Sequence, residues 1–130
     1  MLGFISKFFG GSKSEKDVKK IEPLVIKINQ HFAAYQSISN DELRGKTQEF
    51  RQRIKAHLTG IETEIAEANR KAEELPFNDL MGKDAIYQQV DKLKKERDKQ
   101  IEEILQEILP EAFAAVKETA KRFTNNTEII

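Results

Sequence analysis

The sequence has no cysteine and no tryptophan, and it has little glycine or proline. Its 130 residues include six glycines and three prolines, fewer than an average chain of this length carries. The lack of cysteine excludes a disulfide scaffold, a thiol nucleophile and cysteine-ligated zinc, and it fits a reducing compartment. The scarcity of residues that break helices favours long helices over a collagen-like chain or an all-β sandwich.

An excess of one charge and a long apolar run are missing as well. The chain carries 22 basic and 22 acidic residues. This balance lacks the basic excess typical of nucleic-acid-binding proteins, so we predict no nucleic-acid partner. No uninterrupted apolar run is longer than five residues, far short of the ~20 residues that span a bilayer. The first residues also lack the apolar core and cleavage site of a secretory signal.

The sequence shows no catalytic, cofactor-binding or metal-binding motif. The string Gly11-Ser12-Lys13-Ser14 lacks the spacing of a phosphate-binding loop and is better interpreted as a polar linker with a helix cap. The two histidines, His31 and His57, form no metal-binding pair. Acidic and basic residues alternate along the second half, which is typical of solvated helix faces. We therefore predict no catalytic, cofactor or metal site.

Residues 1–11 form a short amphipathic segment that ends in a glycine pair. Over residues 1–20, five lysines oppose two acidic residues. A basic, aromatic-rich amphipathic stretch is typical of a membrane-surface anchor. Alternatively, its three phenylalanines pack on another part of the same protein. The predicted membrane-contacting residues are Leu2, Phe4, Ile5, Phe8, Phe9, Lys7, Lys13 and Lys16.

The pattern over residues 12–37 predicts a helix. Its apolar positions recur at steps of three or four residues, which places them on one face. We expect a kink or a break near Pro23, because proline cannot donate a backbone hydrogen bond. The expected stripe consists of Val18, Ile21, Val25, Ile28, Phe32 and Tyr35.

Residues 38–123 predict a long antiparallel helical hairpin with a turn at 76–82. Ser39 and Glu42 have the spacing of a capping box, flanked by Ile38 and Leu43 as a hydrophobic staple. Near-heptad seams follow on both arms. Pro110 either kinks the return helix or begins a new one. The expected seams are Leu43, Thr47, Phe50, Ile54, His57, Ile61, Ile65, Ala68, Ala72 and Leu75, then Ile86, Val90, Leu93, Arg97, Ile101, Ile104 and Ile108.

The predicted fold class is therefore all-α, an elongated antiparallel helical hairpin plus a shorter N-terminal helix. Residues 124–130 follow a polar turn and end on two isoleucines. We interpret them as the truncated edge of a longer protein. Three apolar residues near this end, Phe113, Val116 and Phe123, are expected to pack on the rest of such a longer protein. Without it their surface would be exposed, which favours a homo-oligomer because exposed apolar surface promotes association.

Three segments together resemble the N-terminus of SecA, the family of ATPases that move preproteins through the bacterial SecYEG channel. They are MLGFISKFFG at residues 1–10, SNDELRGKTQEFRQRI at 39–54 and ILPEAFAAVKETAKR at 108–122. The second and third are the specific ones. Many SecA proteins join them by a short connector, so residues 56–107 or thereabouts are expected to be a lineage-specific helical insertion.

The resemblance implies a membrane-associated role in protein transport. In that family the amphipathic N-terminus contacts acidic phospholipids and helps to recruit the motor to SecYEG. The expected location is the cytoplasm, peripherally associated with the inner face of the plasma membrane. The ATP and Mg²⁺ sites of the family lie beyond the third segment, so these 130 residues are expected to be neither an enzyme nor an ATP-binding unit.

Two alternatives do not depend on this resemblance. One is a stand-alone coiled-coil scaffold or adaptor that dimerises through its apolar seam. The other is a membrane-remodelling protein, which would require the hairpin itself to bind bilayers. A phosphate-binding loop downstream in the gene would favour the SecA resemblance. A stop codon after residue 130 would favour the scaffold.

Overall fold

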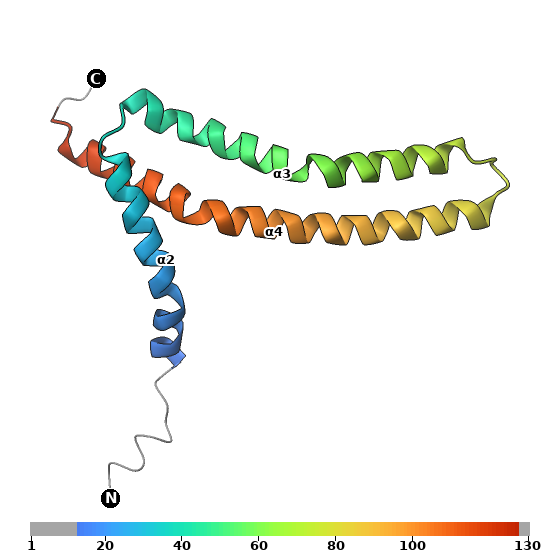
Figure 1. Ribbon diagram of the computed structural model, residues 1–130, viewed down its shortest axis with the longest axis horizontal. Coiled ribbons are helices and arrows are strands. Elements are labelled where there is room, and N and C mark those ends of the chain that lie inside the picture. Colours follow the sequence, from blue (N-terminus) through green and yellow to red (C-terminus); the bar gives the residue numbers. More distant parts are fainter. Residues whose placement is uncertain (1–12, 128–130) are drawn as a thin grey trace, which may run out of the picture. The chain divides into compact units, whose positions relative to one another are not determined.

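The computed structural model describes residues 13–127, and this part of the chain consists of three helices with no strand (Figure 1). They are α2 at Lys13–Tyr35, α3 at Asn40–Glu74 and α4 at Leu80–Asn125. The predicted all-α class is thereby confirmed. No helix in this range has both the length and the hydropathy of a bilayer-spanning segment.

Contacts divide the chain into two compact units. The terminal unit comprises the residues up to Leu43 together with those from Pro110 onward, and the hairpin unit is Arg44–Leu109. Each unit has its own cluster of buried apolar side chains. We describe the two units separately.

The hairpin unit pairs the greater part of α3 with the first part of α4, and the two run antiparallel (Figure 1). Its central cluster contains the buried residues Ile61, Ile65, Ala68 and Val90, with Leu58, Ile86 and Leu93 packed against them. Ala72, Ile104 and Ile108 are also buried. Arg53 Nη2 donates to Glu107 Oε1 at 2.8 Å across the two helices. The predicted apolar pairing of the two arms is therefore confirmed.

The seam on α3 differs from the predicted one at two positions. His57 and Thr47 are both exposed, whereas Leu58 is half-buried and packs on the central cluster. With Leu58 in place of His57, the seam from Ile54 to Ala72 keeps the strict alternation of four and three residues that a helix pair requires. The apolar leucine fits this alternation, and the polar histidine lies beside it in solvent.

The turn of the hairpin is shorter than residues 76–82. Helix α4 begins at Leu80, so Gly82 lies in its first turn. The Gly82 amide donates to Asp79 Oδ1 at 2.9 Å, which makes Asp79 the N-cap of α4. A Cβ on residue 82 would collide with the Asp79 side chain. Glycine is therefore needed at this position because it leaves space for the capping side chain of Asp79. It does not mark the end of the turn.

Arg97 is a basic residue at a seam position of α4. Its side chain is 30% exposed, and its Nη atoms lie 3.8 Å from Glu62 and 3.4 Å from Asp98. Its Nε atom is buried and has no hydrogen-bond partner among the described residues. Desolvation without full pairing costs free energy, although a charged seam residue also fixes the register of a helix pair.

Replacing Arg97 by leucine is expected to raise the free energy of unfolding by about 1 kcal/mol, because the leucine removes the unsatisfied Nε and extends the apolar seam. Urea denaturation followed by circular dichroism measures the change. The exposed neighbour Lys94 provides the control, since Lys94→Leu should shift stability by no more than ~0.5 kcal/mol. A loss of stability in Arg97→Leu would show that the guanidinium stabilises the seam.

The terminal unit packs the second half of α2 against the start of α3 and the last part of α4. Tyr35, Leu43 and Ala114 are its buried residues, and the half-buried residues around them are Ile28, Phe32, Ile38 and Ala115. The predicted capping box is present. The Ser39 amide donates to Glu42 Oε2 at 2.7 Å, and the Glu42 amide donates to Ser39 Oγ at 3.1 Å.

Two prolines lie inside helices. Helix α2 continues through Pro23 and helix α4 continues through Pro110. Neither proline therefore breaks its helix, and no new helix begins at Pro110. Each removes one intrahelical hydrogen bond, because proline has no backbone N–H.

Candidate functional site

The first half of α2 carries a line of exposed lysines. Of the predicted membrane-contacting residues, Leu2, Phe4, Ile5, Lys7, Phe8 and Phe9 lie outside the described residues. Lys13 and Lys16 are exposed in the first turns of α2. Lys20 and Lys27 follow them at spacings of four and seven residues, which places all four on one helix face. We call Lys13, Lys16, Lys20 and Lys27 the lysine stripe.

The same half of α2 also has an exposed apolar face. Val18, Ile21 and Val25 were expected to continue the packed stripe of this helix, but all three are exposed. Only Ile28, Phe32 and Tyr35 pack in the terminal unit. Helical spacing places the exposed apolar face opposite the lysine stripe and borders it with Glu15, Asp17 and Glu22. This half of α2 is therefore amphipathic.

Arg122 of α4 joins all three helices of the terminal unit. Its Nη2 donates to the carbonyl oxygens of Tyr35 at 2.9 Å and Ile38 at 2.7 Å. Its Nη1 donates to Asn40 Oδ1 at 2.7 Å. The Tyr35 and Ile38 carbonyls lie where α2 has ended, so a basic side chain satisfies acceptors that the helix leaves unpaired.

The same guanidinium neutralises a buried carboxylate. Arg122 Nε donates to Glu118 Oε1 at 2.8 Å, and the Glu118 side chain is only 4% exposed. Its other oxygen, Oε2, has no hydrogen-bond partner among the described residues. A buried charge of this kind is tolerated only when it is paired. We call Glu118 and Arg122 the α4 ion pair.

Two lysines of α4 complete the contact with α2. Lys117 Nζ lies 4.3 Å and Lys121 Nζ 5.4 Å from the centre of the Phe32 ring, which is the geometry of cation–π contacts. Lys117 also donates to Asn29 Oδ1 at 2.9 Å. The basic residues at the end of α4 thus contact α2 and the start of α3. Their only signal in the sequence was their place in the segment 108–122.

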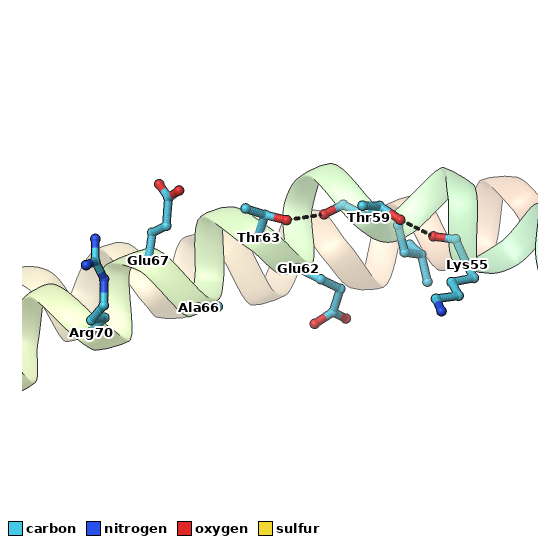
Figure 2. A pocket seen from close by; sticks show the side chains of 8 residues that line it. Lys55, Thr59, Glu62, Thr63, Ala66, Glu67 and Arg70 are labelled. Atoms are coloured by element: carbon cyan, nitrogen blue, oxygen red, sulfur yellow. Dashed lines mark hydrogen bonds between the residues drawn. The ribbon is translucent and has the colours of Figure 1, made fainter.

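A shallow groove lies along α3 in the hairpin unit (Figure 2). Its volume is about 610 Å³, and its lining residues are Lys55, Leu58, Thr59, Glu62, Thr63, Ala66, Glu67 and Arg70. The Thr59 and Thr63 hydroxyls donate to the carbonyls of Lys55 at 2.7 Å and Thr59 at 2.8 Å. Both hydroxyl protons are therefore engaged with the backbone. The groove offers no nucleophile with a base beside it.

Two common kinds of ligand site, the glycine-rich phosphate loop and the cluster of metal ligands, do not occur among the described residues. Gly45 and Gly60 lie inside α3 and Gly82 lies in the first turn of α4, so no glycine-rich loop is present in this range to bind phosphate. No three His, Asp or Glu side chains of residues 13–127 gather as metal ligands. We derive no catalytic step from these residues.

Comparison with known proteins gives one consistent family. The family described as the SecA DEAD-like domain matches residues 5–129. "Protein translocase subunit SecA" of Christiangramia forsetii is 45% identical over 128 residues, 98% of this chain and 11% of the relative. The subunit of Chloroherpeton thalassium is 44% identical over 122 residues, 94% of this chain and 12% of the relative. No solved structure matches the chain.

These matches cover nearly the whole chain but little of each relative. The SecA subunit of Cytophaga hutchinsonii, 39% identical over 129 residues, covers 99% of this chain and 11% of the relative. Such coverage includes residues 56–107, so these relatives also have a counterpart of this segment in their sequences. The chain spans 11–12% of the length of these three relatives.

Proposed function

The chain belongs to the SecA family of protein translocase subunits, and from this premise we propose that its 130 residues attach such a subunit to an anionic membrane surface. The attachment serves recruitment to the SecYEG channel and not catalysis. The protein would thus be cytoplasmic and peripherally associated with the inner face of the bacterial plasma membrane. ATP, Mg²⁺ and preproteins would bind to other parts of a full-length subunit.

The lysine stripe is the observation that supports this proposal. Lys13, Lys16 and Lys20 are exposed on one face at the start of α2, directly after the predicted amphipathic segment 1–11. A lysine near an anionic bilayer contributes on the order of 1 kcal/mol of binding free energy. Residues Leu2, Phe4, Ile5, Phe8 and Phe9 would add apolar insertion. Family membership favours this function over the stand-alone scaffold and the membrane-remodelling protein.

Charge removal on the stripe is expected to weaken membrane binding strongly. The triple variant Lys13→Gln, Lys16→Gln, Lys20→Gln should bind vesicles of anionic phospholipid about 100-fold more weakly, from roughly 1 kcal/mol per lysine. Deleting residues 1–10 should also weaken binding. Co-sedimentation with vesicles at low salt measures both effects, and vesicles of zwitterionic lipid should bind neither form.

A matched control separates the stripe from net charge. Lys92, Lys95 and Lys99 are exposed on α4 with the same spacing of three and four residues, and their replacement by glutamine removes the same total charge. This control should retain wild-type vesicle binding. Equal binding by the wild type, the stripe variant and the deletion would refute the proposed function.

A further inference from the structure

The described residues leave an apolar face open on the first half of α2. Val18, Ile21 and Val25 are 61%, 52% and 44% exposed. Helical spacing places these three side chains on one side of α2, away from the lysine stripe. We call Val18, Ile21 and Val25 the α2 face.

The charges beside the α2 face limit what can cover it. Glu15, Asp17 and Glu22 border it. An anionic bilayer would repel these carboxylates, and a second copy of the same face would place them opposite one another. A covering group that is both apolar and basic avoids both kinds of repulsion.

The segment just before α2 has this chemistry. Residues 1–9 contain one lysine, Lys7, and no acidic residue, and most of the others are large and apolar. Gly10, Gly11 and Ser12 separate this segment from the first residue of α2. Antiparallel helices are joined by loops of about two to five residues, and glycine permits the backbone angles of a tight turn. The connection is therefore suited to a reversal of the chain.

We propose that residues 1–9 fold back on α2 and cover the α2 face until the protein meets an anionic membrane. An antiparallel pair with this short connection brings Ile5 opposite Val18 and Leu2 opposite Ile21. Lys7 then lies on the stretch of α2 that carries Glu15 and Asp17. The two interpretations of segment 1–11 thus describe two states, one packed on α2 and one inserted in a bilayer.

The contact would regulate membrane attachment, and this part of the inference rests on the proposed function. The lysine stripe lies on another side of α2 and remains open for a first contact with anionic lipid. Release of residues 1–9 then supplies the apolar side chains that insert. A segment that inserts only when released binds with an affinity reduced by the released fraction. The chain would therefore keep its apolar anchor covered away from membranes.

Disulfide cross-linking tests the contact without lipid. The chain has no cysteine, so two introduced thiols report only on each other. Ile5→Cys, Val18→Cys should oxidise about fivefold faster or more than Ile5→Cys, Lys19→Cys, because a disulfide requires Cα atoms within about 7 Å. Val18 and Lys19 are both exposed and adjacent on α2, but they occupy different sides of the helix. Thiol alkylation and mass spectrometry at low protein concentration measure both rates, and equal rates would overturn the proposal.

Binding to anionic vesicles tests the regulatory role through the sign of the effect. Val18→Gln, Ile21→Gln removes most of the α2 face without changing charge, and glutamine is a good residue for an exposed helix position. The variant should bind about three- to tenfold more tightly than the wild type, because residues 1–9 no longer have to be released. Co-sedimentation measures the change. Unchanged binding would contradict the regulatory role, and weaker binding would mean that the α2 face itself enters the bilayer.

Two controls make this result specific. In the form that lacks residues 1–10, the same two substitutions should leave vesicle binding unchanged, and tighter binding there would count against the proposal. Val116→Gln, Phe123→Gln changes two exposed apolar residues of α4 and should also leave binding by the whole chain unchanged. If no form binds vesicles, the proposed function and the regulatory role both fail, and the cross-linking rates alone decide whether residues 1–9 pack on α2.

Discussion

Replacing Arg122 by alanine is expected to lower the free energy of unfolding by about 3 kcal/mol, because it leaves the buried Glu118 carboxylate without its partner. The change also removes the donors to the Tyr35 and Ile38 carbonyls and to Asn40. Those three acceptors belong to α2, the connection after it and α3. The terminal unit should therefore be affected more than the hairpin unit. Urea denaturation followed by circular dichroism measures the loss.

Two further variants test the reason for this loss. Arg122→Lys retains the charge but not the planar fork that reaches four acceptors, so its stability should lie between alanine and wild type. Arg70→Ala is the control, since the Arg70–Glu74 pair is 3.6 Å long with both side chains more than 60% exposed. Exposed pairs of this kind contribute at most ~1 kcal/mol. If Arg122→Ala costs no more than Arg70→Ala, the α4 ion pair does not stabilise the unit.

The local signals in the sequence predicted local structure well. Ser39 and Glu42 are three residues apart, so their reciprocal hydrogen bonds depend only on the chain near them. The heptad spacing identified Ile61, Ile65 and Val90 as seam residues because burial in a helix pair repeats with the period of the helix. The same period led to the wrong prediction that His57 lies in the seam. From Ile54, a step of three residues reaches His57 and a step of four reaches Leu58, and both steps fit the period of the helix. The apolar Leu58 is the residue that packs on the cluster.

Contacts between distant residues could not be predicted in this way. Arg122 is 82 to 87 residues away from Asn40 and Tyr35, and no pattern in the sequence connects them. The exposed face of α2 was missed for a related reason. Periodicity shows which residues share a face, but the length of the packed contact depends on where α4 crosses the helix. Val18 and Ile21 therefore had the pattern of core residues without a partner.

Because the hairpin unit has its own buried cluster, a substitution in that cluster is expected to lower stability strongly. Ile65 is 6% exposed in the hairpin cluster and packs with Ile61, Ala68 and Val90. Replacing it by alanine is expected to lower the free energy of unfolding by about 3 kcal/mol, the usual cost of a large-to-small change in a core. Leu105 lies in the same unit but is 49% exposed. Leu105→Ala should therefore cost clearly less, about 1 kcal/mol.

Amide hydrogen exchange can assign this loss to one unit. Because the hairpin cluster and the terminal cluster share no residue, Ile65→Ala should speed exchange most at the amides around residues 58–93. Arg122→Ala should act mainly on amides at 28–43 and 111–123. Regions with separate buried contacts open with separate free energies. Helices α3 and α4 continue through both units, so equal acceleration everywhere in both variants would mean that the continuous helices couple the units into one cooperative structure.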